Sequence, residues 1–397
     1  MEYDIVVIGA GISGSSFAFF SAQRGKRVLI LEKNERLGGA LCSQKNSTQD
    51  YWVDLGAHTC YNSYNSFIKL IKSLQLGKQI APLAKLHFFF YENHQLKSVI
   101  SKLNIIALFY NLILKKASKE SSTVKQYYSK KVGTKNYENV LKYAFRAVIS
   151  QIADDFPADI FLKKRKYRNK KIPKKFSIHG GMQSVVEKIS KSDNIETINN
   201  FTINQIVIDY SGNRYTITST NENDKIQTKN IAIATPPLEA ARLLLNIAPD
   251  IAKTLNKYTQ EVIVSISVVI AKENIKVKKV AGIIFTSDNL YSAVSRDKVD
   301  HSSLRAFTFH FKKETQIEKY YTDKICEVLS IKKEDIVDTK IVENSLPRIT
   351  MNNNIQKLIV QCNNMNNLYV VGNYFYGLSI EDCVNRSLDE SERYLKL

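Results

Sequence analysis

The chain begins with short apolar runs separated by a glycine-rich turn. Residues 3–7 can form a buried strand, residues 9–14 read Gly-Ala-Gly-Ile-Ser-Gly, and residues 15–24 have the composition of a helix. A second apolar run, residues 28–31, ends at Glu32. This order predicts a strand, a tight turn, a helix and a second strand parallel to the first.

The spacing of the three glycines is typical of a turn that receives a dinucleotide. Gly9 permits the tight turn, Gly11 lets a pyrophosphate approach the backbone, and Gly14 lets the helix pack closely on the strand. The start of the helix then offers free N–H groups and a partial positive charge to the phosphates. Glu32 can accept hydrogen bonds from ribose hydroxyls. Because all the parts have the required spacing, we predict a dinucleotide-binding unit rather than a structural turn in another α/β domain.

Later segments alternate between helical and strand-like patterns. Helical spacing of apolar residues predicts helices over residues 65–76, 185–190 and 318–329. The expected strands are residues 84–91, 230–234, 262–270, 282–285, 304–311 and 337–344. Because residues 262–270 are strongly β-branched, we expect them to form the central strand of a second sheet.

Composition limits the class of protein. The 397 residues can bury a large core, and the formal net charge of +19 implies attraction to an anionic partner or reflects a lysine-rich genome. The five cysteines form neither a C-x-x-C motif nor a metal-like cluster, which is typical of reduced thiols in a cytoplasmic protein. No segment has the pattern of a signal peptide or a transmembrane helix. We therefore expect a cytoplasmic protein without a metal site, either free or peripheral on the inner face of the membrane.

Two segments could meet an anionic surface. Residues 163–175 carry nine lysines and arginines, which could contact anionic lipid or form a solvated loop. No nucleic-acid module accompanies them, so we expect no nucleic-acid partner. Residues 100–117 are apolar around most of the helix circumference and have lysines at both ends. This segment predicts either a helix lying in a membrane interface or a buried helix of the substrate domain.

The residues after Glu32 indicate which dinucleotide is bound. Residues 32–41 resemble the second signature of FAD-binding flavoproteins, E-x-x-x-R-x-G-G, with Arg36, Gly38 and Gly39 at the defining positions. Arg36 offers a donor fork suited to phosphate, and the paired glycines permit close backbone contact. The resemblance implies FAD as the cofactor.

The C-terminal segment resembles a third signature of the same family. Residues 367–383 follow the pattern of a strand, a Gly-Asp pair, a second glycine and a helix that begins at the flavin. Here Asn373 replaces the usual aspartate. With the D-x-G segment at residues 54–56 and the A-T-P segment at residues 234–236, the order of signatures resembles the protoporphyrinogen-oxidase-like branch of the flavin amine oxidase superfamily. A chain of this family has an α/β fold in which an α+β substrate domain and a helical insertion interrupt a Rossmann-type FAD-binding domain.

The resemblance divides the chain into five parts. It assigns residues 1–80, 181–245 and 346–397 to the FAD-binding domain, residues 81–180 to the substrate domain with the helical insertion, and residues 246–345 to the substrate-domain sheet.

The resemblance also implies a set of site residues. The expected cofactor-binding residues are Gly9, Gly11, Ser13, Gly14, Glu32, Lys33, Arg36, Gly38, Gly39, Gly56, Ala57, Ile203, Thr235, Gly372, Asn373, Gly377, Leu378, Ser379 and Ile380. The candidates for substrate contact are His87, Phe307, Phe309 and Arg348. His87 stands where the family carries an arginine that pairs with a porphyrin carboxylate. Phe307 and Phe309 share one face of a strand and could line a cavity or belong to the core. No catalytic acid or base is expected, because the cofactor carries the chemistry.

The implied reaction is hydride transfer from a small-molecule substrate to FAD, followed by reoxidation by oxygen or a quinone. The leading substrate is protoporphyrinogen IX. The alternatives are a related enzyme acting on an amine, a polyene or a nucleotide sugar, and a flavin-free binding or escort protein on the same fold. The sequence leaves the oligomeric state and the electron acceptor open.

Overall fold

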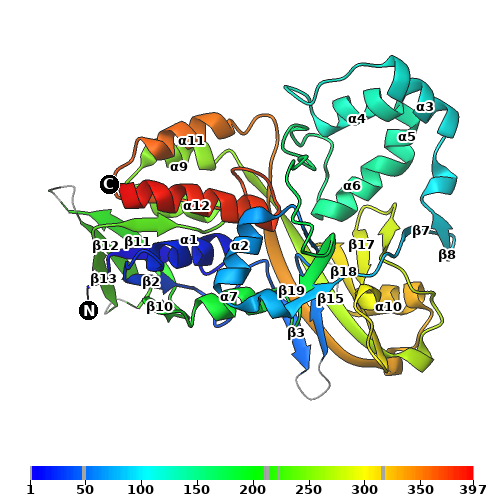
Figure 1. Ribbon diagram of the computed structural model, residues 1–397, viewed down its shortest axis with the longest axis horizontal. Helices are drawn as coiled ribbons and strands as arrows, with labels where there is room; N and C mark the ends of the chain where they lie inside the picture. The colour runs from blue at the N-terminus through cyan, green and yellow to red at the C-terminus, as the bar shows by residue number, and fades with distance from the viewer. Residues whose placement is uncertain are drawn as a thin grey trace.

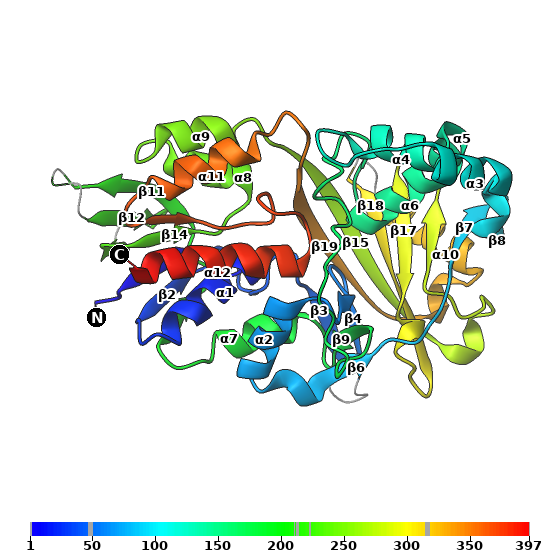
Figure 2. The same cartoon turned by 45° about the horizontal axis from the view of Figure 1, so that its top comes forward.

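The computed structural model describes residues 2–46, 51–209, 211, 214–221, 224–313 and 318–396. The chain forms two lobes that lie side by side (Figure 1). Both termini lie in the first lobe, and a long pair of strands runs along the boundary with the second (Figure 2).

A five-stranded parallel sheet organises the first lobe. Its order is β10 (Ile195–Ile198), β2 (Val28–Leu31), β1 (Ile5–Ile8), β14 (Ile231–Ile233) and β20 (Leu368–Val370). β1 and β2 are entirely buried, as expected for continuous apolar runs in a parallel sheet. The predicted strand–turn–helix–strand unit is therefore present, with β1 hydrogen-bonded beside β2.

Helices cover this sheet on both faces. α1 (Ile12–Ala22) packs against α12 (Ile380–Lys396), so the two ends of the chain meet at the centre of the lobe (Figure 1). The other helices of this lobe are α2 (Asn65–Ser73), α7 (Gln183–Ile189), α8 (Pro237–Leu244), α9 (Pro249–Leu255) and α11 (Ile355–Asn363). α9 packs against α8 and α11, although the division by resemblance placed residues after 245 in the substrate domain.

Three small sheets complete the first lobe. One is a meander of β11 (Ile203–Ile208), β12 (Tyr215–Ser219) and β13 (Lys225–Thr228). The second is the hairpin of β3 (Ser43–Asn46) and β4 (Tyr51–Asp54). In the third, β9 (Lys175–Ile178) lies between β5 (Cys60–Tyr61) and β6 (Ile80–Pro82).

A seven-stranded mixed sheet forms the second lobe. Its order is β19 (Ile336–Arg348), β15 (Thr259–Ala271), β18 (Leu304–Lys312), β17 (Leu290–Ser295), β16 (Gly282–Phe285), β7 (Phe88–Glu92) and β8 (Gln95–Ser98). β15 is thus the second strand from one edge, and the expectation that it is central is wrong. Its β-branched composition instead fits its burial between β19 and β18, which flank it together from Ile263 to Ile270. The strand expected over residues 84–91 begins only at Phe88.

Helices lie at two places on the second sheet. α10 (Glu318–Leu329) packs on one face, with Tyr321, Ile325 and Leu329 buried against the sheet. The insertion contains α3 (Ile105–Leu114), α4 (Val124–Val132), α5 (Thr134–Asn136) and α6 (Lys142–Ile149), which gather at one end of the lobe (Figure 2). None of the helices in the described part of the chain combines the length and apolarity needed to cross a bilayer.

α3 has an unusual orientation for an apolar helix. Its buried residue is Asn111, whose Nδ2 donates to Ala107 O, whereas Ile106 and Ile113 are 85% and 77% exposed. The alternative in which this segment is a buried helix is therefore wrong.

Candidate functional site

The turn between β1 and α1 has the geometry of an open anion site. Gly9 adopts φ +103°, which favours glycine, and a Cβ there would lie 3.0 Å from Ala234 O. A Cβ on Gly14 would lie 2.0 Å from Gly9 O, so only glycine fits this helix–strand contact. At Gly11 nothing lies within 4 Å of such an atom. No side chain caps α1 and no acidic residue lies in its first turn, so its first amides are available to a ligand.

Glu32 closes one side of this turn at the end of β2. Its Oε2 accepts a hydrogen bond of 2.9 Å from Ala10 N, and its Oε1 accepts from Asn34 N and Nδ2 at 3.0 Å. The carboxylate is thereby fixed beside the glycine turn, and Oε2, which accepts one bond, keeps a further lone pair for a ribose hydroxyl. Lys33 is exposed next to it, and the Ser13 carbonyl accepts from Ser387 Oγ at 2.7 Å, where α12 meets α1.

Arg36 holds its own loop together. Its guanidinium donates to Leu37 O at 3.0 Å, Leu41 O at 3.1 Å and Gly39 O at 2.8 Å. These bonds hold Gly38 and Gly39, at φ +111° and +55°, next to the first turn, where Gly38 forms a parallel bridge with Gly11. In this arrangement the arginine donors meet backbone carbonyls, so the phosphate contact predicted for Arg36 stays a prediction.

The loop after β4 lies against the Arg36 loop. A Cβ on Gly56 would lie 1.9 Å from Ala40 O, which explains the glycine. Asp54 accepts hydrogen bonds from Ser43 Oγ at 2.7 Å and Met182 N at 2.8 Å, and these bonds join the loop to the start of α7. Burial raises the pKa of Asp54 to about 6, against the effect of these two bonds. Ala57 is exposed beside Gly56.

His58 follows in the same loop. Its Nδ1 lies 3.0 Å from Gly56 O, so the neutral ring donates Nδ1–H to that carbonyl and leaves a lone pair on Nε2. Burial, reinforced by the charge of Lys298, lowers the pKa of His58 to about 3. The ring is therefore neutral at physiological pH.

The segment from β20 to α12 brings the C-terminal signature to the same region. Gly377 has φ +127°, and a Cβ there would lie 2.9 Å from Asp382 Oδ2. Ser379 and Asp382 form a reciprocal cap: Ser379 N donates to Asp382 Oδ2 at 3.3 Å, and Asp382 N donates to Ser379 Oγ at 3.2 Å. Leu378 precedes this cap and Ile380 lies within it. Gly372 and Asn373 come earlier in the same segment, and a Cβ on Gly372 would lie 2.3 Å from the Tyr374 ring.

Two further predicted cofactor residues lie in the first lobe, one in the β11–β13 meander and one just after β14. Ile203 begins β11, and its carbonyl accepts from Arg242 Nη2 at 2.8 Å. Thr235 follows β14, and its Oγ1 is buried without a partner in the described residues. Because a buried hydroxyl without a hydrogen bond is costly, Thr235 is a candidate donor to a bound group.

The candidates for substrate contact are not brought together. The His87 side chain is exposed just before β7, and Arg348 is half-buried at the end of β19. Phe307 and Phe309 are fully buried in the cluster under α10, and so belong to the core rather than to a cavity wall. Since side chains alternate along a strand, their neighbour Thr308 points the other way and donates to Asp54 O at 2.9 Å. The proposed cavity role of Phe307 and Phe309 is therefore corrected.

Two residues of this region were not identified from the sequence. Arg165 belongs to the basic segment 163–175, and its Nη2 lies 2.9 Å from Asp382 Oδ1 and 3.0 Å from Ser379 Oγ. Lys298 ends the short turn η5 (Arg296–Lys298) and lines a cavity beside His58. Neither residue belongs to a sequence motif. For Arg165 the basic segment was a partial signal, whereas nothing in the sequence pointed to Lys298.

The comparisons with known proteins agree with this geometry. A model of the NAD(P)-binding Rossmann-like domain matches residues 7–74. Over 74 residues, or 19% of the chain, the sequence is 42% identical to flavin-containing amine oxidase A of Bos taurus. The aligned segment spans 14% of that protein, so the sequence likeness concerns the dinucleotide-binding part.

The likeness of the fold extends over the whole chain. A protein provisionally assigned as a protoporphyrinogen oxidase from Exiguobacterium sp. 255-15 superposes with a TM-score of 0.74, with 12% identity and 99% of each chain covered. Cyclohexylamine oxidase from Brevibacterium oxydans IH-35A gives a TM-score of 0.70, with 13% identity and 100% of each chain covered. The chain therefore has the fold of these two proteins: a Rossmann-type domain joined to a second domain built on a mixed sheet.

Proposed function

We propose that the protein is an FAD-dependent oxidoreductase that removes a hydride from a small-molecule substrate. The observation that carries the proposal is the uncapped start of α1 above Gly11, where an added Cβ would meet open space. Glu32 beside this turn and the unpaired Thr235 hydroxyl fit the ribose and phosphate groups of a dinucleotide. The residues present therefore suit FAD, and the likeness of the sequence to flavin-containing amine oxidase A supports the same cofactor.

FAD, when bound, supplies the hydride acceptor, and its reoxidation by oxygen or a quinone completes the reaction. The chain has three tasks of its own: to bind the cofactor, to exclude water and to orient the substrate. The amides of α1 and the carboxylate of Glu32 would hold the nucleotide. The start of α12 would place a partial positive charge near the reacting ring. A buried, neutral His58 is consistent with a site that excludes solvent.

We propose protoporphyrinogen IX as the substrate, which loses hydride and proton pairs to become protoporphyrin IX. The order of the signatures and the likeness to the Exiguobacterium protein support this choice, and the net charge of +19 suits a substrate with carboxylate groups. The second candidate is an amine, favoured by the 42% identity to an amine oxidase around the first turn. A purified protein whose flavin is reduced by an alkylamine and not by protoporphyrinogen IX would select the amine.

We also propose that the enzyme works at an anionic membrane surface, with α3 as the contact. The large apolar side chains of this helix are turned outward, and Lys115 and Lys116 are exposed at its end. This arrangement suits the boundary between acyl chains and anionic headgroups.

A matched pair of glycine substitutions tests the cofactor assignment. Neither Gly11 nor Gly77 has a neighbour within 4 Å of an added Cβ, and neither has a positive φ, so Gly11→Ala and Gly77→Ala should both leave the fold intact. Only Gly11→Ala should lower FAD affinity, by at least about tenfold, because the methyl group would occupy the path of the pyrophosphate. FAD content after reconstitution is the measurement. Equal FAD content in the two variants, or a wild-type protein that takes up no FAD, would contradict the proposal.

A further inference from the structure

A small cavity lies between the loop after β4 and the segment from β17 to η5, next to the D-x-G segment at residues 54–56. Its volume is about 40 Å³, room for a few water molecules. Its polar walls are formed by two basic residues, Arg296 and Lys298, and by Asp54, His58, Thr59, Ser177, Ser295 and Thr308. The two lobes thus jointly build one polar chamber, because these residues come from both.

Lys298 is a cation of this chamber without an anionic partner. Its Nζ lies 5.2 Å from the centre of the Phe88 ring, and in the described part of the chain no carboxylate lies within 4.0 Å of it. Burial lowers the pKa of Lys298 to about 8, and the nearby charge of Lys175 acts in the same direction. Since enclosing an ammonium group without a counter-ion is costly, the position calls for an anion.

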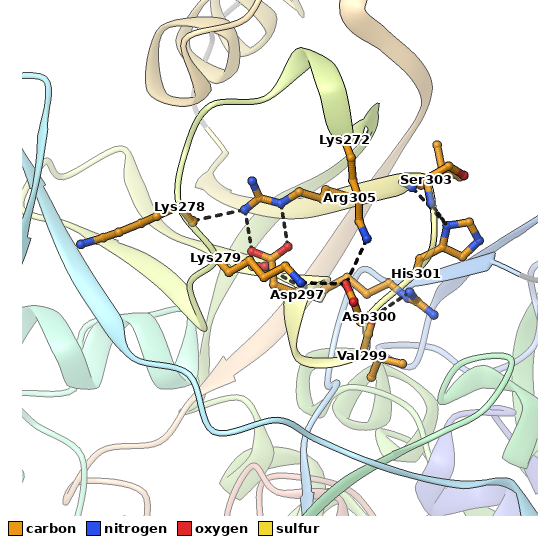
Figure 3. Close-up of polar contacts among 12 residues, drawn as sticks. Lys272, Lys278, Lys279, Asp297, Val299, Asp300, His301, Ser303 and Arg305 are labelled. Atoms are coloured by element: carbon orange, nitrogen blue, oxygen red, sulfur yellow. Dashed lines mark hydrogen bonds and ion pairs between the residues drawn. The ribbon is translucent and has the colours of Figure 1, made fainter.

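The carboxylates near Lys298 are committed elsewhere. Asp297 accepts from Arg305 Nε at 2.8 Å and from Arg305 Nη2 at 2.7 Å, and this pair is almost fully buried (Figure 3). Asp300 pairs with two other lysines of the same region (Figure 3). The Asp297–Arg305 pair fixes η5 on β18 and so holds Lys298 at the chamber wall without neutralising it.

The acid within the chamber is occupied as well. Asp54 accepts from Ser43 Oγ and Met182 N, and more weakly from Ser177 Oγ at 3.4 Å. The nearby cation that favours its ionised form is Arg296. Asp54 is therefore held by donors of its own and leaves Lys298 to another group.

Thr59 is a second hydrogen-bond donor among the residues that line the chamber. Thr59 Oγ1 is buried and has no hydrogen-bond partner among the described residues. His58 is neutral, so it adds no positive charge, and its Nδ1–H donates to Gly56 O. Within the described residues, the chamber thus combines an ammonium group that has no carboxylate partner with an unpaired hydroxyl, beside the guanidinium of Arg296.

We propose that this chamber binds a carboxylate group of the substrate, with Lys298 supplying the charge and Thr59 a second hydrogen bond. The volume admits a carboxylate but not a ring system, so the rest of the ligand lies outside. Naming the ligand as substrate rests on the oxidoreductase function proposed above, whereas carboxylate binding itself does not. The site differs from the position of His87, whose exposed side chain has no part in the chamber. It selects substrates with carboxylate side chains over simple alkylamines.

The test is calorimetric titration of the full-length protein with propionate, with neutral propionamide as the matched ligand. Lys298→Met should weaken propionate binding about tenfold or more, because a charge-assisted hydrogen bond is lost. Thr59→Val should weaken it several-fold. Lys279→Met, which removes a lysine paired with Asp300 outside the chamber, should leave it unchanged. Urea unfolding of each variant checks that it is folded. If Lys298→Met is unstable, Thr59→Val is the variant that tests the site.

Several results would overturn the proposal: equal propionate affinity in wild type and in both chamber variants, equal binding of propionamide, or inorganic phosphate binding as tightly as propionate. The proposed oxidoreductase function is tested by a separate result, the uptake of FAD. If propionate binds through Lys298 in a protein that takes up no FAD, the carboxylate site stands and the enzyme assignment falls. If FAD binds and propionate does not, only the carboxylate site falls.

Discussion

The guanidinium of Arg165 lies 2.9 Å from Asp382 Oδ1, which joins the most basic segment of the chain to the first turn of α12. The same Nη2 reaches Ser379 Oγ, and the guanidinium lies 4.8 Å from the centre of the Tyr64 ring. Both partners of the ion pair are largely buried. A segment that the sequence assigns to lipid or solvent is therefore attached to the first turn of α12 through Arg165, one of its nine basic residues.

Replacing Arg165 by glutamine should release this attachment. The variant loses a partly buried ion pair, and we expect a cost of about 1–3 kcal/mol in the free energy of unfolding together with faster trypsin cleavage within residues 163–175. Lys164→Gln, at an exposed neighbouring position, is the control and should change neither. Urea unfolding and timed proteolysis are the measurements. Identical cleavage rates in the two variants would show that the ion pair does not hold the segment.

The buried pair of Asp297 and Arg305 should matter more than the exposed ion pairs beside it. Asp297→Asn leaves an arginine without its counter-charge in the interior, and we expect a loss of about 3–5 kcal/mol. Asp300→Asn removes a carboxylate that is 63% exposed, so its effect should stay below about 1 kcal/mol. Urea unfolding at neutral pH separates the two cases. Similar losses in both variants would contradict this assignment.

The stability of the protein should fall as pH decreases from 6.5, in part through His310. This ring is buried beside Ser265 Oγ at 2.9 Å, and burial lowers its pKa to about 4. Between that value and the unfolded pKa of about 6.5, the unfolded state binds the proton more readily, so folding loses up to about 1.4 kcal/mol per pH unit. His310→Gln should flatten this slope. Asp54 and His58 are present in both proteins, and the charge of His310 is the smallest of the causes that lower the pKa of His58. The difference between the urea unfolding curves of the two proteins at pH 4.5 to 6.5 therefore reports mainly on His310. Parallel curves would show that the ring does not contribute.

The sequence predicted well those elements whose pattern is local. β2 and α10 have the predicted bounds, and the glycine turn lies between β1 and α1. The side chains of Phe307 and Phe309 share one face of β18, as the sequence predicted. The alternation of side chains along a strand does not indicate which face packs against α10 and which faces the first lobe.

The residues that sequence reasoning missed depend on distant contacts. Lys298 is one of many lysines, and only the meeting of η5 with the loop after β4 encloses it. Arg165 is likewise distinguished from its basic neighbours by Asp382, which lies 217 positions away in the chain. The apolar pattern of α3 covered most of its circumference and so could not decide which side faces the protein.

Vesicle binding tests the role of α3. Ile106→Ser combined with Ile113→Ser removes two exposed apolar side chains, and we expect binding to phosphatidylglycerol-containing vesicles to weaken at least tenfold. Val360→Ser, at a position on α11 that is 57% exposed, is the control. Because all three side chains are more than half exposed, the free energy of unfolding should change little. Co-sedimentation that is equal for the double variant and the control would contradict a membrane contact at α3.

The central claim is tested most directly by adding protoporphyrinogen IX to the purified, FAD-loaded protein without oxygen and following the flavin absorption near 450 nm, roughly the band of oxidised flavin. We predict that the band bleaches, and that it returns with the appearance of fluorescent protoporphyrin when air is admitted. A yellow protein whose band does not change would contradict protoporphyrinogen IX as the substrate. A protein that cannot be loaded with FAD would contradict the oxidoreductase function itself.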